Sequence, residues 1–216
     1  MKQVILYAMF TVLLVATGLS SCDDHDVIDS NARVGDVVFA DHSIMSYGLF
    51  SVDTFAQVSR TPVAVVFAEK TDNHPALAVL LREPQQAAFA DTIGATLGTS
   101  TVLDSCTGRS NTAALYATGK SPAASALFTF DSGRSAFLPC VYEARLLSSS
   151  LGTVNPIIRK LGGTPVSTES TVWYWTSTEV SGNGGYQAWS FNANTGSIQP
   201  TPKTLSKNIR AIIELE

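Results

Sequence analysis

The sequence predicts an α+β fold, because strand-like segments come first, helical segments fill the middle, and strand-like segments return at the end. Of the 216 residues, 45% are hydrophobic and 15% are charged. That composition is typical of a folded chain rather than a disordered one. The exposed surface must therefore depend on Ser, Thr, Asn and Gly more than on charge.

The N-terminus predicts export and lipidation. Lys2 precedes a short apolar run that ends in Leu19-Ser20-Ser21-Cys22, which resembles the cleavage motif of a bacterial lipoprotein signal peptide. We expect residues 1–21 to be removed and Cys22 to carry the acyl chains. An ordinary secretory signal is the alternative, and it exports the chain as well.

Residues 22–33 are acidic and poor in apolar side chains, which predicts a flexible tether ahead of a domain at 34–216. Acidic residues directly after the cysteine also resemble the surface-export signals of some Gram-negative anaerobes. We therefore expect an outer-membrane lipoprotein, exposed at the cell surface and held to the membrane by its lipid alone. The formal net charge is −4 with no basic cluster, which argues against nucleic acid as a partner.

Three early segments predict strands. Residues 34–41 form the first, and the apolar runs 61–70 and 75–83 are joined by the polar turn Thr-Asp-Asn-His. Two such runs around a short polar turn are typical of a β-hairpin.

The middle of the chain predicts helices. Residues 84–133 are alanine-rich, with helical segments expected at 85–93, 111–119 and 121–130. A pair of amphipathic helices follows at 138–152 and 153–163. Glu143 lies in the first turn of the earlier one, and Gly162 ends the later one.

Strands are expected at 172–179, 186–196 and 207–216. Residues of a strand alternate between two faces, so Trp189 and Phe191 share one face of the second strand while Ser190 and Asn192 share the other. We expect the aromatic face to point into the core.

Cys106 and Cys140 remain after lipidation. In an oxidising compartment they can form a disulfide, and two buried free thiols are the alternative. Spacing alone does not decide between them.

The ordered motifs of the chain resemble a bacterial branch of the C-type-lectin-like fold. They are a Leu-Pro-x-x-x-Glu helix start at 138–143, Leu-Gly-Gly at 161–163, Trp-Thr-Ser-Thr-Glu at 175–179, Ala-Trp at 188–189 and Ile-Arg at 209–210. The resemblance covers about residues 34–216. It implies a central antiparallel sheet and structural roles for Pro139, Glu143, Trp173, Trp175, Glu179, Trp189 and Arg210.

The resemblance also implies a ligand-binding face on the late strands and loops, for a protein or glycan ligand. The residues expected there are Ser181, Asn183, Tyr186, Ser190, Asn192, Asn194, Ser197, Thr201, Thr204, Leu205, Ser206 and Asn208. Tyr, Ser, Gly and Asn together are typical of paratopes. The calcium-ligand triplets of animal lectins are missing, and no cysteine motif of the formylglycine-generating relatives occurs, so we expect no metal, no cofactor and no enzyme. A hydrolase built on Asp41-His42 is a weaker alternative.

Two readings of this binding module remain open. The layout of 173–210 resembles the variable regions of diversity-generating retroelements, in which asparagine codons are mutated at adenines. The alternative is an adhesin with a fixed face. Outside this class, a structural or fimbria-associated envelope subunit would use the same face to contact another protein.

Overall fold

The computed structural model describes residues 31–131 and 135–215, and it confirms an α+β fold with antiparallel sheets. Asn31–Glu216 form one compact unit. The predicted signal peptide, Cys22 and most of the predicted tether lie outside the described residues. Within the described ranges, no helix combines the length and apolarity needed to cross a membrane.

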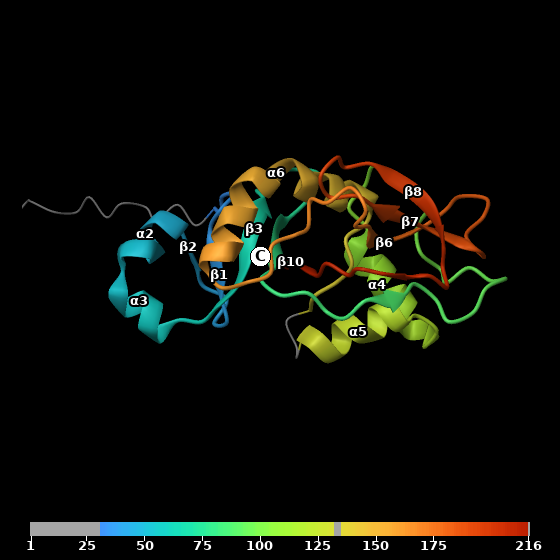
Figure 1. The fold of residues 1–216 in the computed structure, drawn as a ribbon, viewed down its shortest axis with the longest axis horizontal. Helices are drawn as coiled ribbons and strands as arrows, with labels where there is room; N and C mark the ends of the chain where they lie inside the picture. The colour runs from blue at the N-terminus through green and yellow to red at the C-terminus, as the bar shows by residue number, and fades with distance from the viewer. Residues whose placement is uncertain (1–30, 132–134, 216) are drawn as a thin grey trace, which may run out of the picture. The chain divides into compact units, whose positions relative to one another are not determined.

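A five-stranded sheet forms the centre of the unit, in the order β10-β4-β3-β1-β2 (Figure 1). The predicted hairpin is present as β3 and β4, with Val65 opposite Val79, and the C-terminal strand β10 pairs with β4. The bounds are β1 Val37–Phe39, β2 Ile44–Met45, β3 Pro62–Ala68, β4 Ala76–Leu80 and β10 Ile212–Leu215. Because β10 and β2 are outermost, they are the edges of this sheet.

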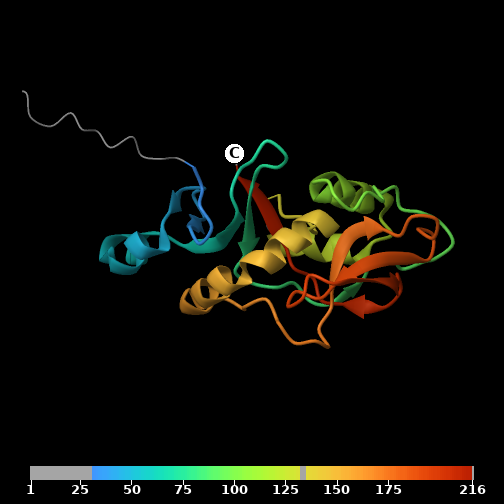
Figure 2. The same cartoon turned by 90° about the horizontal axis from the view of Figure 1, so that it is seen from above.

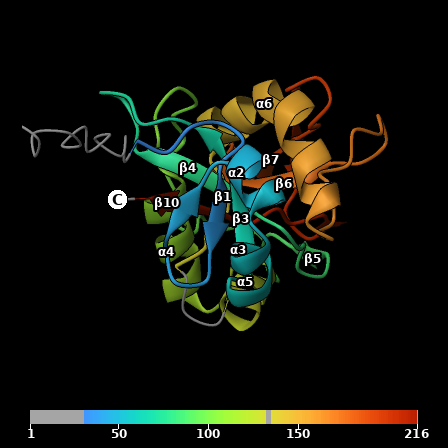
Figure 3. The same ribbon diagram turned by 90° about the vertical axis from the view of Figure 1, so that its left-hand side faces the viewer.

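Both faces of the central sheet are covered, which explains why β3 and β4 are almost entirely apolar. On one face Val65 and Val79 pack against helix α6, Val141–Lys160. On the other face Ala64 and Ala78 lie in a second core with α4, Gly108–Thr118, and α5, Pro122–Asp131. Figure 3 shows α6 and the pair α4 and α5 on opposite sides of the sheet.

The predicted pair of amphipathic helices is wrong: α6 is one continuous helix of 20 residues. Its buried stripe runs through Leu147, Leu151, Val154 and Ile158 at alternating spacings of four and three, so packing holds the helix together across the expected break. Pro156 removes only one intrahelical hydrogen bond from this stripe. The predicted end is correct, since Gly162 has a φ of 73° just after the last turn.

The predicted helix at 85–93 is also wrong. The segment contains the two-residue strand β5, Ala87–Ala88, which pairs with β9, Ser206–Lys207, and continues as irregular chain. Alanine content favoured a helix, but tertiary contacts decide this segment. Two short helices that the sequence pattern does not indicate, α2 Tyr47–Val52 and α3 Thr54–Ser59, follow β2.

A three-stranded antiparallel sheet contains the late strands β6 Tyr174–Glu179, β7 Gln187–Phe191 and β8 Ile198–Pro202. The predicted strands at 172–179 and 186–196 correspond to β6 and β7, whereas β8 was not predicted. The predicted strand at 207–216 is divided into β9 and β10. Within the Asn31–Glu216 unit, Figures 1 and 2 place this sheet at the end opposite to α2 and α3.

Candidate functional site

The sequence predicts that the face of β7 with Trp189 and Phe191 points into the core, and the structure shows this only for Phe191. Ala188 and Ser190 point inward and are fully buried, whereas Trp189 is only partly buried beside Pro200 of β8. Phe191, on the same face as Trp189, is buried because it packs against Tyr174 at the α6 end of the strand. The face that carries the aromatics is therefore covered at one end and open at the other.

Three residues of the predicted ligand face are buried, and we correct that prediction. Ser190, Asn192 and Thr201 have exposures of 0%, 3% and 3%. The hydroxyl oxygens of Ser190 and Thr201 lie 2.7 Å apart, and Asn192 Nδ2 donates to the carbonyls of Glu169 and Val172 at 2.9 Å each. These side chains join elements of the fold and do not reach solvent.

The other predicted residues divide between the two ends of the late sheet. Asn194 and Ser197 are exposed in the β7–β8 turn, near α6. Asn208 is partly buried, and its Oδ1 accepts a hydrogen bond from Gln86 Nε2 at 2.8 Å. At the far end of β7 the exposed residues are Ser181, Asn183, Tyr186, Thr204, Leu205 and Ser206.

Three loops meet at this far end. The backbone N–H of Gly94 donates to the carbonyl of Gly185 at 2.9 Å, and that of Lys203 donates to the carbonyl of Tyr186 at 3.0 Å. Three exposed apolar side chains come from these loops: Ile93 at 56%, Tyr186 at 54% and Leu205 at 48%. We call the surface formed by Ile93, Ser181, Asn183, Tyr186, Thr204, Leu205 and Ser206 the loop face. Sequence reasoning missed Ile93 because it precedes the late strands by many residues and was placed on a helix.

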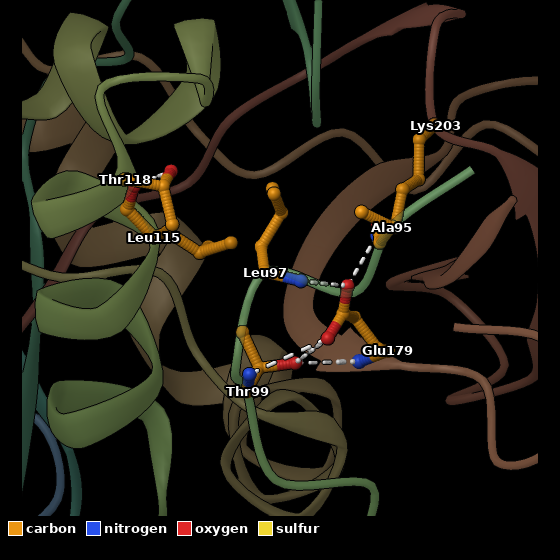
Figure 4. Close-up of polar contacts among 7 residues, drawn as sticks. All are labelled: Ala95, Leu97, Thr99, Leu115, Thr118, Glu179 and Lys203. Carbon is orange, nitrogen blue, oxygen red and sulfur yellow. Dashed lines mark hydrogen bonds and ion pairs between the residues drawn. The ribbon is translucent and has the colours of Figure 1, made fainter. Parts of the chain in front are cut away.

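A buried ion pair joins the loops beneath this surface. The ammonium of Lys203 and the carboxylate of Glu179 form an ion pair with exposures of 0% and 1% (Figure 4). Glu179 also accepts hydrogen bonds from the backbone N–H of Leu97 at 2.8 Å and the hydroxyl of Thr99 at 3.2 Å. Lys203 Nζ also lies 5.5 Å from the centre of the Phe89 ring. Glu179 and Lys203 thereby connect the loop at 93–99 to β6 and to the end of β8.

The remaining predicted motif residues lie in the interior or at its margin. Trp175 is fully buried and Trp173 is only partly buried, so the prediction of a core position is wrong for Trp173 and Trp189. Arg210 is fully buried, and its guanidinium donates to Glu83 at 2.9 Å and to the carbonyl of Leu80 at 2.7 Å. Burial lowers the pKa of Arg210, and the charge of Glu83 opposes that effect. Pro139 is buried before α6, and its carbonyl accepts from the N–H of Ser177 at 2.8 Å.

Glu143 forms a second buried polar cluster with the two described cysteines. Its carboxylate accepts from the backbone N–H of Cys140 at 2.7 Å, from the Cys106 thiol at 2.8 Å and from the N–H of Gly108 at 3.2 Å. A Cβ at position 108 would lie 2.1 Å from Glu143 Oε2, so glycine is needed there. Burial raises the pKa of Glu143, and the hydrogen bond from the Cys106 thiol opposes that rise. Cys106 and Cys140 are free thiols, as in the second of the two predicted alternatives, but only Cys140 is buried and Cys106 is partly exposed.

The thiol pKa values predict that the protein loses stability in alkali. Burial, followed by the charge of Glu143, raises the pKa of Cys140 from 9.0 to about 11, and burial also raises that of Cys106. Above pH 9 the unfolded chain loses these protons while the native protein keeps them. Stability should therefore fall between about pH 9 and 11, by about 1.4 kcal/mol per pH unit for a fully buried group such as Cys140. Urea unfolding at pH 8, 9 and 10 measures how the free energy of unfolding changes with pH. If that free energy falls as steeply in Cys140→Ala as in wild type, the assignment to Cys140 is contradicted.

Asp41 and His42, the residues of the alternative hydrolase, lie in a local turn after β1. The Asp41 carboxylate accepts from the hydroxyl of Ser43 at 2.5 Å and from its backbone N–H at 3.0 Å, and these hydrogen bonds lower the pKa of Asp41. They close a local turn and do not orient His42, whose φ is 66°. Among the described residues, no group of three or more His, Cys, Asp or Glu side chains is arranged to hold a metal ion.

No protein-family model matches this chain, and no curated protein matches its sequence.

Proposed function

We propose that the chain is a surface-anchored lipoprotein with a C-type-lectin-like fold that binds a protein or glycan ligand through the loop face. One observation carries this proposal. Three exposed apolar side chains, Ile93, Tyr186 and Leu205, gather on loops that a fully buried ion pair holds together. The ordered motifs of the sequence support the assignment of the fold.

A platform of this kind suits recognition. Tyr186 offers a large contact area with few rotatable bonds, and the neighbouring Asn183 and Thr204 offer adaptable hydrogen bonds. Because the ion pair and its hydrogen bonds already order the loops, binding costs little further conformational entropy. No catalytic step is needed for this function, and we propose none.

Replacing Tyr186 with serine should weaken ligand binding at least roughly tenfold, because exposed tyrosines at the centre of an interface supply much of its energy. The measurement is binding of the purified full chain to arrayed glycans and to arrayed extracellular proteins. Tyr116→Ser is the matched control, since Tyr116 is a similarly exposed tyrosine, at 47%, on α4. A ligand that binds wild type and Tyr186→Ser equally would contradict the proposal.

A more specific version of this proposal is that a retroelement diversifies those codons of the loop face that lie within residues 173–210. The exposed Tyr186, Thr204 and Leu205 are residue types that adenine changes in an asparagine codon can produce, and Asn183 is the type that an unchanged codon encodes, which is compatible with the idea. The buried Ser190, Asn192 and Thr201 would then be fixed positions. Sequencing the locus tests the idea: a near-copy of the DNA for residues 173–210, differing only at adenines and lying beside a reverse transcriptase, is the expected result. Without such a copy, the protein is a fixed adhesin or an envelope subunit.

An envelope subunit is the second candidate function. It is favoured by a cavity of about 620 Å³ that borders the edge strands β10 and β2. An edge strand beside a cavity can accept a segment of another protein as an additional strand. This cavity has a mixed lining, with apolar residues such as Ile44 and Leu215 and charged ones such as Lys70 and Arg109. This form of the hypothesis differs from the expectation that an envelope subunit uses the late-sheet face: the partner would contact residues such as Ile44 and Leu215 and would leave the loop face free.

A further inference from the structure

The helices α2 and α3 present an unusual apolar surface to solvent. Leu49, Val52, Phe55 and Val58 have exposures of 55%, 73%, 78% and 89%. Leu49 and Val52 are three residues apart in α2, and Phe55 and Val58 are three residues apart in α3. Each pair therefore lies on one side of its own helix. We call these four residues the α2–α3 face. Single exposed apolar residues need no explanation, but four large ones within ten positions mark an interaction surface.

The fold holds this surface outward. Phe50 and Ala56, on the inner side of the two helices, are buried in a small core in which the Phe39 and Phe50 rings lie 5.2 Å apart. The Ser46 and Asp53 side chains cap the two helices by accepting from backbone N–H groups. Rotation that would bury the outer residues would expose this core and break both caps.

The charges around the face point to one kind of partner. Asp53 is the only charged residue between 43 and 59, and its carboxylate is occupied by the cap. Two cations stand at the border: Arg60, 5.5 Å from the centre of the Phe39 ring, and Lys160, 5.4 Å from that of Tyr47. An apolar surface whose one anion, Asp53, is held in a helix cap and whose border carries two cations suits the interface of a lipid bilayer, with acyl chains at its centre and phosphates at its rim.

We infer that the α2–α3 face rests in the outer layer of the lipid bilayer and orients the domain on the membrane. The inference depends on the proposed lipid anchor at Cys22. Cys22 and Asn31 are nine residues apart in sequence, and such a segment spans at most about 32 Å even when fully extended. The domain therefore stays within a short distance of the bilayer.

Contact between the α2–α3 face and the membrane would orient the domain. The first described residues lead into β1, on the same side of the unit as α2, while the late sheet and its loops lie at the opposite end (Figures 1 and 2). With the α2–α3 face on the membrane, the loop face points away from it. The lipid supplies attachment, and the apolar helices supply orientation.

Tryptophan fluorescence of the lipidated full chain in vesicles tests the inference. The vesicles contain phosphatidylethanolamine and phosphatidylglycerol, with or without bromine on the acyl chains to quench nearby indoles. Two variants are compared with wild type, which has three tryptophans: Phe55→Trp, and Tyr186→Trp as the matched control at the other end. Brominated lipid should remove roughly half or more of the emission added at position 55 and almost none of that added at position 186.

The outcomes separate the inference from the proposed function. If the protein floats with vesicles, Cys22→Ser does not, and the indole at position 55 escapes quenching, then the anchor stands and the inference is wrong. If the unsubstituted protein does not float with vesicles, the proposed lipid anchor and the inference about the α2–α3 face are both wrong. If the added emission shifts to the blue in detergent as protein concentration rises, and not with lipid, then the face binds a second copy and the inference fails.

Discussion

Replacing Glu179 with glutamine should lower the free energy of unfolding by about 3–5 kcal/mol, the usual cost of leaving one partner of a buried ion pair without its counter-charge. Glutamine keeps the shape of the side chain, so the loss comes from the Lys203 ammonium, which is fully buried. Among the described residues, its other polar and aromatic contacts are to the carbonyl of Ala95 at 3.4 Å and to the Phe89 ring, which carry no full charge. Urea unfolding at neutral pH measures the change.

A double-mutant cycle identifies the pair as the cause. Lys203→Met alone should also destabilise the protein, whereas Glu179→Gln combined with Lys203→Met should cost clearly less than the sum of the two single changes. Additive losses would show that the two groups do not depend on each other, and the account of the loops as a fixed platform would then be wrong.

Replacing Trp175 with alanine should cost about 3–5 kcal/mol, because the change leaves a large cavity in a fully buried position. The indole packs edge-to-face on Phe89 with ring centres 5.4 Å apart, and its Nε1 donates to the carbonyl of Ala87 at 2.9 Å. The truncation removes both contacts and leaves that carbonyl without its indole donor. Thermal or urea unfolding measures the loss.

Trp189→Ala is the matched control, because Trp189 is partly exposed and buries less surface. It should cost less than half as much as Trp175→Ala. Equal losses at the two positions would contradict the assignment of Trp175 to the core and of Trp189 to the open side of the late sheet.

The elements that could be predicted from the sequence are those with strong local patterns. The β3–β4 hairpin follows from two apolar runs around a polar turn, and the end of α6 follows from Gly162. The continuity of α6 was missed because Gly152 and Pro156 indicate a break locally, whereas the burial of Leu151 and Val154 on one side sustains the helix. The irregular chain near Leu97 and Thr99 depends on hydrogen bonds to Glu179, which no local pattern reveals.

The candidate site was predicted only in part for a related reason. Tyr186 and Leu205 are exposed as expected, but Ser190 and Thr201 are buried because their hydroxyls pair with each other across β7 and β8. The sequence alone does not indicate whether a polar side chain on a strand will form its hydrogen bonds with water or with another side chain. Ile93 joins the site through contacts far apart in the sequence: the hydrogen bond between Gly94 and Gly185, and the bonds of Glu179 and Lys203 to residues 95–99.

The most direct test of the proposed binding face is a hydrogen-exchange footprint of the full chain with the first ligand that the arrays return. We expect slower exchange in three segments, 93–96, 181–187 and 203–206, and unchanged exchange in α4 and in the edge strands β2 and β10. Protection confined to β2 or β10 would contradict the loop face as the binding site and would favour the envelope-subunit alternative.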